Sequence, residues 1–278
     1  MNDLLNNPAV QAAVVPFIVA LLLGFALAGT RYLVLAVASG LVVVLALTIG
    51  FSMEPFTAVK KLIVAVFATV AVAMAFEAAG AAARRPVIAA LAVAAGLAAV
   101  WVPLRVLLQM ESTSPWLAGL GAFALATATT ATSVGAARGS PLRASVVGAC
   151  LGWGSGVLAL LGASALLAQI GIAIGSASAA VALVQMVRGR EAPLGWTLVM
   201  PAAVAAAIVG VLASSTGELR WYCLIPLPLV PVATLMLRPS AKRRAWKTAL
   251  VTGVAAMAPV VIAVGLAWAS ASSSSAAG

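Results

Sequence analysis

Glu77 is the acidic residue that lies deepest inside a long apolar segment of this chain. Ionisable side chains within membrane helices are rare, and they commonly mark proton or cation pathways. The segment runs from Leu62 to Gly80, with Glu77 near its inner end. One interpretation makes Glu77 a proton or cation site. The other, which the sequence favours, places Glu77 at the membrane interface, where Arg84 or Arg85 holds it.

Hydroxyl side chains gather near the end of another apolar segment, which runs from Trp116 to Gly135. They could line a polar path or coordinate Na⁺ together with backbone carbonyls. Alternatively, they bond to carbonyls one turn earlier and to neighbouring helices. They cover more than half of a helical wheel, which favours this structural interpretation. The residues are Thr127, Thr129, Thr130, Thr132 and Ser133.

Pro226, Pro228 and Pro231 fall close together within one apolar segment. Each proline removes a backbone donor, so together they must break or kink a helix. Broken helices recur at the binding sites of transporters, where freed carbonyls face a cavity. The alternative is a purely structural kink near the outer surface, and the sequence does not decide between the two.

Two glycine stripes lie in the uncharged run from Ala144 to Val187. Residues spaced by four fall on one face of a helix. In a bilayer, small residues at this spacing let two helix backbones approach closely. The stripes therefore predict a tight helical hairpin in which one stripe packs against the other. The first stripe is Gly148, Gly152 and Gly156, and the second includes Gly171 and Gly175.

Trp153 lies between Gly152, a member of the first stripe, and Gly154. Its indole could stack against a ligand, although packing into a groove between helices is the simpler interpretation. The candidate transport path consists of Glu77, Thr129, Thr130, Trp153, Pro226 and Pro228.

The sequence offers little for catalysis or metal binding. It contains no histidine, which removes the commonest metal ligand and the usual general base near neutral pH. Cys150 and Cys223 both lie in apolar segments and form no CxxC motif. We therefore expect no enzyme activity, no metal and no cofactor, and an intramembrane lipid-modifying enzyme is the least supported class.

Composition identifies the class of protein. Hydrophobic residues make up 64% of the 278 residues and charged residues 8%, whereas soluble domains are about half apolar and about a quarter charged. The mean hydropathy is +1.17. The net charge of +10 comes from Lys and Arg at the ends of apolar segments. It therefore indicates contact with anionic lipid headgroups in a bilayer and no binding to nucleic acid.

The apolar segments predict an all-α, polytopic membrane bundle of about ten transmembrane helices. A span needs about 20 apolar residues. Residues 144–187 are too long for one span and must fold back near Gly162–Ser164. Residues 1–270 then form one transmembrane domain, whose candidate halves are residues 1–140 and 141–270. Residues 271–278 are expected to form a disordered tail. The predicted spans are Ala9–Gly29, Tyr32–Phe51, Leu62–Gly80, Pro86–Leu107, Trp116–Gly135, Ala144–Gly162, Leu166–Val187, Leu194–Ala213, Trp221–Leu237 and Ala249–Ser270.

The distribution of basic residues predicts the orientation. Of the 16 Lys and Arg residues, 12 fall in one set of alternate loops and four in the other. The positive-inside rule places the richer set, which includes Arg238–Lys247, in the cytoplasm and both termini outside. Ala26-Leu27-Ala28 resembles a signal-peptidase site, but Met1–Asn7 contains no Lys or Arg. We therefore expect an uncleaved first helix in a bacterial inner membrane.

The leading functional hypothesis is a permease or exporter for a small solute. It rests on the span count, the short loops and the proline-rich segment. The alternative is a non-catalytic integral subunit or scaffold of a larger membrane complex, with homo- or hetero-oligomeric contacts in the bilayer. A central polar cavity would favour the permease, whereas a solid core with an exposed apolar flank would favour the subunit.

Overall fold

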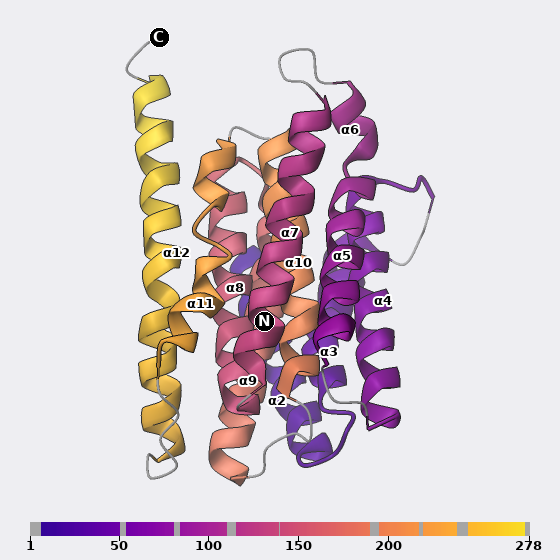
Figure 1. Ribbon diagram of the computed structural model, residues 1–278, viewed down its shortest axis with the longest axis vertical. Coiled ribbons are helices and arrows are strands. Elements are labelled where there is room, and N and C mark those ends of the chain that lie inside the picture. Colours follow the sequence, from indigo (N-terminus) through magenta and orange to yellow (C-terminus); the bar gives the residue numbers. More distant parts are fainter. Residues whose placement is uncertain are drawn as a thin grey trace.

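The chain folds into a bundle of helices that run up and down along one direction (Figure 1). The computed structural model describes residues 7–50, 54–80, 84–109, 115–138, 140–189, 195–216, 219–237 and 244–275. No strand occurs in these ranges, so the predicted all-α class is confirmed.

The first part of the bundle contains five long helical segments. Asn7 accepts a hydrogen bond of 2.9 Å from the Ala9 amide, as expected at a helix start. Thr57 caps the third segment in the same way by accepting from the Lys60 amide. The elements are η1 (Val10–Val14), α2 (Val15–Leu27), α3 (Val34–Val44), η2 (Leu45–Ile49), α4 (Ala58–Ala78), α5 (Arg85–Trp101), α6 (Leu104–Leu108) and α7 (Pro115–Ala137).

The second part begins at Ser140, whose side chain accepts from the Arg143 amide while Pro141 occupies the first helical position. Gly189, with a φ of 60°, ends the second helix of this part. The elements are α8 (Pro141–Leu161), α9 (Ala165–Arg188), α10 (Gly195–Thr216), η3 (Trp221–Leu224), α11 (Leu229–Leu235) and α12 (Ala245–Ser275).

Seven helices in the described ranges are long and apolar enough to cross a membrane. Three shorter apolar helices overlap the other three predicted spans: Val34–Thr48, Arg85–Trp101 and Trp221–Leu235. The polytopic helical class is therefore supported, whereas the count of ten spans stays a prediction.

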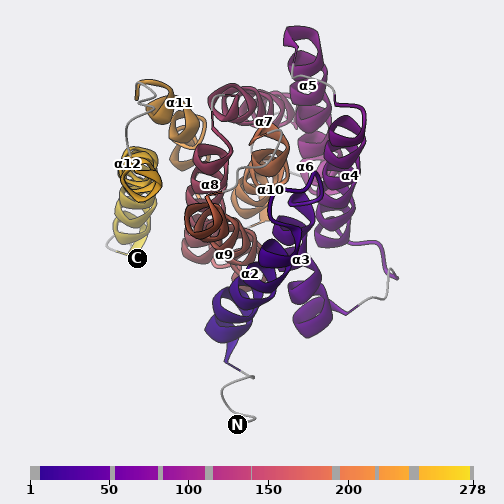
Figure 2. The same cartoon turned by 90° about the horizontal axis from the view of Figure 1, so that it is seen from below.

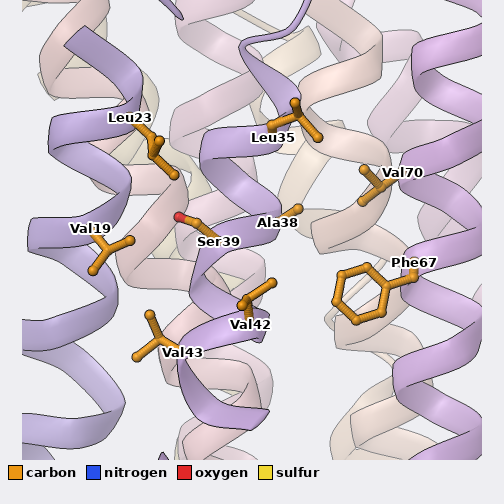
Figure 3. Close-up of a pocket in the computed structure, with 9 residues that line it drawn as sticks. All are labelled: Val19, Leu23, Leu35, Ala38, Ser39, Val42, Val43, Phe67 and Val70. Carbon is orange, nitrogen blue, oxygen red and sulfur yellow. The ribbon is translucent and has the colours of Figure 1, made fainter. Parts of the chain in front are cut away.

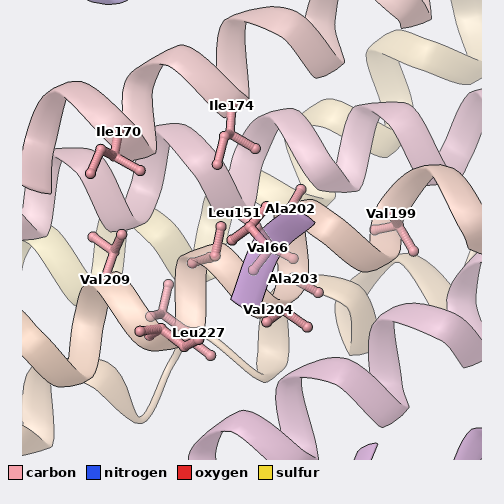
Figure 4. Packing of buried hydrophobic residues seen from close by; sticks show 14 of the residues in the cluster. Val66, Leu151, Ile170, Ile174, Val199, Ala202, Ala203, Val204, Val209 and Leu227 are labelled. Carbon is pink, nitrogen blue, oxygen red and sulfur yellow. The ribbon is translucent and has the colours of Figure 1, made fainter. Parts of the chain in front are cut away.

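The helix α10 forms the centre of the bundle. It packs against α4, α7, α8 and α9, and Figure 2 shows these helices around it. Within its most apolar stretch, 94% of the residues are buried, against 28% for α12, which stands at one edge. Ile170 and Ile174 of α9, Leu151 of α8 and Ala202 of α10 belong to this common core (Figure 4).

The predicted turn between α8 and α9 is confirmed at Gly162–Ser164. Within it, Ala163 adopts a φ of 60°, a left-handed conformation that few non-glycine residues adopt. A turn this short makes α8 and α9 an antiparallel pair along their whole length, and their contact is the most extensive between any two described helices.

The glycine stripes lie at the contact between α8 and α9. A Cβ atom on Gly156 would come within 2.8 Å of the Ile172 amide, and one on Gly171 within 2.7 Å of the Gly156 Cα. A Cβ on Gly175 would meet the Trp153 amide at 2.7 Å, and Gly152 lies against Gly171 and Gly175. The first glycine, Gly148, instead lies between Ser178 of α9 and Ala202 of α10.

The last helix extends further than the sequence predicts. Helix α12 continues to Ser275, so residues 271–275, expected to belong to a disordered tail, are helical. Residues 276–278 of that predicted tail lie outside the described residues.

Candidate functional site

Glu77 is buried within the bundle. It lies in the last turn of α4 with 6% of its surface exposed. The hydroxyl of Thr197, in the first turn of α10, donates a hydrogen bond of 2.5 Å to its Oε1. Arg84 and Arg85, which the favoured interpretation placed beside Glu77, are both exposed. Glu77 is therefore buried between two helices, and its position relative to the membrane interface stays a prediction.

Two aromatic rings pack beside the Glu77–Thr197 contact. Phe76 and Trp196 meet edge to face, with 5.4 Å between their ring centroids. Trp196 is 2% exposed, and its indole nitrogen has no hydrogen-bond partner among the described residues. The Phe76–Trp196 pair fills space between α4 and α10. The Glu77–Thr197 hydrogen bond and the Phe76–Trp196 contact thus both join α4 to α10.

The hydroxyls of α7 divide into two groups. Thr129 and Thr132 bond back to the carbonyls of Leu125 and Ala128, both at 2.7 Å. Thr127, Thr130 and Ser133 have hydroxyl oxygens that are buried without a hydrogen-bond partner among the described residues. Both Thr130 and Ser133 are 0% exposed. Such groups are rare in protein interiors and call for an explanation.

Ser133 lies at nearly the same depth as Thr197. The ends of α7 and α10 meet, since a Cβ on Gly195 would lie 2.7 Å from the Ala137 carbonyl oxygen. At about 1.5 Å per residue, Ser133 is about 6 Å from that contact along α7, and Thr197 about 3 Å along α10. The unbonded Ser133 hydroxyl and the Glu77–Thr197 contact thus lie at a similar distance from the start of α10.

Trp153 lies apart from these groups, on α8. Its indole nitrogen donates a hydrogen bond of 3.2 Å to Ser176 of α9, and 37% of its surface is exposed. Its backbone and ring pack against Gly175. This arrangement agrees with packing between α8 and α9 and brings Trp153 near none of the other candidates on α4 and α7.

The proline-rich segment is broken, as predicted. A turn at residues 225–228 separates the 3₁₀-helix η3 from α11, which is only seven residues long. Pro226 is buried, and the carbonyl of Pro228 accepts a hydrogen bond of 3.4 Å from Thr132 of α7. The Pro228 carbonyl thus faces α7, while Leu224 and Leu227 pack against Gly210 of α10.

Sequence reasoning missed two polar contacts near the start of α8 and the end of α9. Gln185 donates a hydrogen bond of 3.0 Å to Ser145, and both side chains are at most 2% exposed. Arg143, 8% exposed, donates one of 3.2 Å to the Leu237 carbonyl at the end of α11. Each contact joins two helical segments. The two residues of each pair lie far apart in the sequence, so residue spacing could not reveal the contact.

An apolar groove runs along α3 on the side of the bundle (Figure 3). It has a volume of about 300 Å³. Figure 3 shows Val19 and Leu23 of α2 on one side and Phe67 and Val70 of α4 on the other. Ser39 is its polar residue, and that hydroxyl bonds to the Ala36 carbonyl at 2.7 Å. The groove is open at the side and carries no charged side chain.

The described residues contain no group of three or more His, Cys, Asp or Glu side chains that could hold a metal ion. No protein-family model matches the chain, and neither a curated protein nor a solved structure matches it significantly. The function must therefore be argued from the contacts around α10.

Proposed function

We propose that this protein is a permease or exporter for a small solute, which it moves by alternating between conformations of the bundle. The observation that carries the proposal is the position of Glu77, buried between α4 and α10. Taking a carboxylate out of water is costly, and within membranes such side chains are retained mainly where they bind or move an ion or a solute.

Two further features support a transport pathway near α10. Thr130 and Ser133 present buried hydroxyls that no described group bonds, and Ser133 lies at about the depth of Thr197. Next to the break before α11, the Pro228 carbonyl accepts a hydrogen bond from Thr132 of α7. Irregular backbone at membrane depth is tolerated where it is covered by protein or lines a cavity, as in known transporter folds.

The proposal requires that water reaches these hydroxyls in at least one conformation. The test starts from a variant in which Cys150 and Cys223 are replaced by alanine, and it introduces Ser133→Cys. A small, membrane-impermeant thiol reagent is applied to right-side-out and to inverted membrane vesicles. We expect the thiol at position 133 to react from at least one side.

Ser155→Cys is the matched control. Ser155 is also 0% exposed, but its hydroxyl bonds to the Gly152 carbonyl within α8. We expect no reaction there from either side. If position 133 reacts no faster than position 155 in both kinds of vesicle, the permease proposal is wrong.

A non-catalytic subunit or scaffold of a membrane complex is the second candidate. The close packing around α10 and the apolar groove on the flank favour it, because neither is an open polar pathway. This alternative predicts that positions 133 and 155 stay equally unreactive. It also predicts that the protein, once solubilised in a mild detergent, co-purifies with one specific membrane protein in fixed stoichiometry.

A further inference from the structure

We propose that Arg143 anchors the phosphate of an anionic phospholipid at the end of the bundle where α8 begins and α11 ends. The site goes beyond the proposed function, because it uses none of the residues of the candidate transport path. Its ligand is a phosphodiester headgroup of net negative charge that carries two acyl chains.

The Arg143 side chain is a buried cation held by a neutral partner. It is 8% exposed, and its Nη2 donates the hydrogen bond of 3.2 Å to the Leu237 carbonyl. Its Nε is covered by protein and has no hydrogen-bond partner among the described residues. A guanidinium has five N–H donors, so one carbonyl takes only part of its capacity. Buried charges are normally paired, and the planar fork of a guanidinium matches a phosphate group.

The charges around Arg143 favour an anion. Two of the six acidic residues lie in the described ranges: Glu77 belongs to α4, and Glu54 precedes it. Figure 2 shows α4 on one side of α10, and α8, α11 and α12 on the other. On this other side, Arg244 directly precedes α12 and Lys247 lies in its first turn, both exposed. A zwitterionic headgroup would add a further cation here, so a net negative headgroup fits better.

Helices α8 and α12 begin at the same end of the bundle. A Cβ on Gly253 of α12 would lie 3.8 Å from Val146 of α8, and one on Gly154 of α8 lies 2.9 Å from Val260 of α12. The contacts advance together along both helices, so the two helices run in the same direction. The N-terminus of each carries a partial positive charge, which favours a phosphate near Arg143.

Arg244 lies further toward this end of the bundle than Arg143 does. Val146 faces Gly253, and three residues earlier on the two helices are Arg143 and Leu250. Arg244 precedes Leu250 by six residues, which is about 9 Å at about 1.5 Å per residue. A headgroup whose phosphate binds Arg143 therefore extends toward Arg244.

The level of Arg143 suits a lipid better than a soluble anion. Helix α8 has 21 residues, and at about 1.5 Å per residue it matches a hydrocarbon core of about 30 Å. Arg143 is its third residue and thus lies close to the headgroups in the predicted span. Leu235 and Met236 at the end of α11 are 48% and 80% exposed, and Leu250 is 59% exposed. These side chains offer an apolar surface to acyl chains, which a soluble anion lacks.

The experiment measures the thermal midpoint of unfolding of the full chain in detergent with added lipid. A ligand that binds the folded protein raises this midpoint. Dioleoyl phosphatidylglycerol is the probe, dioleoyl phosphatidylcholine has the same chains with a zwitterionic headgroup, and glycerophosphoglycerol is the headgroup without chains. We expect phosphatidylglycerol to raise the midpoint clearly more than the other two at equal concentration. Native mass spectrometry should show phosphatidylglycerol retained by the protein.

Three variants make the assignment specific. Arg143→Gln should weaken the binding of phosphatidylglycerol by about tenfold or more, because hydrogen bonds from a charged donor are the strong ones. Arg244→Gln leaves the contact between Arg143 and Leu237 intact, and it should weaken binding even if Arg143→Gln fails to fold. Arg105→Gln is the matched control, since it removes an exposed arginine beside α6 at the opposite end of the bundle (Figure 1). Its affinity should equal that of the parent protein.

The proposal is overturned if phosphatidylglycerol and phosphatidylcholine raise the midpoint equally, or if the variants at 143, 244 and 105 all bind phosphatidylglycerol like the parent protein. An equal effect of glycerophosphoglycerol would identify a site for soluble anions and reject the lipid. If Arg143→Gln lowers the midpoint without lipid but keeps the full lipid effect, Arg143 only caps the end of α11, and the lipid site is rejected.

Discussion

The carbonyl oxygen of Gly171 lies so close to Gly152 that a Cβ atom on Gly152 would come within 2.9 Å of it. Because that neighbour is backbone, it cannot move aside unless α8 and α9 separate. We expect Gly152→Ala to destabilise the protein by about 1–3 kcal/mol, the usual range for overpacking. The thermal midpoint of unfolding in detergent measures this effect.

Two other glycines serve as controls for that substitution. A Cβ on Gly154 would lie 2.9 Å from a methyl group of Val260. Val260 belongs to α12, which stands at the edge of the bundle, and a side chain can shift more easily than backbone. Gly154→Ala should therefore be milder. Gly265 has nothing within 4 Å, and Gly265→Ala should be neutral or stabilise α12 by up to about 1 kcal/mol. Equal midpoints for the variants at 152 and 265 would contradict the close contact.

The hydrogen bond between Trp153 and Ser176 predicts a measurable coupling. A double-mutant cycle with Trp153→Phe and Ser176→Ala isolates it from the packing of the ring. We expect a coupling of about 0.6 kcal/mol, typical of interhelical hydrogen bonds in membranes. Unfolding in a detergent mixture provides the four stabilities. A coupling of zero would mean that the indole nitrogen points elsewhere in the folded protein.

Cys150 and Cys223 are free and buried, with 3% and 0% of their surfaces exposed. We therefore predict that a thiol reagent reacts slowly with the folded protein and labels two sites after denaturation. Mass spectrometry under non-reducing conditions counts the labels. A mass that corresponds to an intramolecular disulfide would show that the depth of α8 or of η3 is wrong. Replacing both residues by alanine should leave a folded protein for the labelling experiments.

The distribution of Lys and Arg predicts that both termini lie outside and that the loop 238–247 lies inside. Ser275→Cys and Ser240→Cys, each in the variant without Cys150 and Cys223, test this orientation in intact cells. An impermeant reagent should label position 275 and spare position 240. The reverse pattern would invert the whole topology, and labelling of both positions would place both outside, so that α12 would not cross the membrane.

Much of the local structure follows directly from the sequence. The prolines at 226, 228 and 231 predict the break before α11, because a proline has no amide hydrogen to continue a helix. The length of the uncharged run 144–187 predicts the turn between α8 and α9. Both predictions rest on covalent geometry and on the thickness of the bilayer, which act locally and need no knowledge of neighbouring helices.

The surroundings of Glu77 were only partly predictable. The sequence marks Glu77 as unusual but favours an interfacial position, because its distance from the helix end fits either environment. Its partner Thr197 is 120 residues away, and no spacing rule links them.

The sequence by itself determined that this is a helical membrane protein, because no arrangement in water could cover so much apolar surface. Only the tertiary structure decided which helix lies at the centre. Helices α10 and α12 have nearly equal mean hydropathy in their most apolar stretches, 2.1 and 2.3, yet 94% of the residues in one stretch and 28% in the other are buried. Lipid and protein interior are both apolar surroundings, so hydropathy cannot distinguish them. Packing between helices makes that choice, and it places Thr197 of α10 against Glu77 of α4.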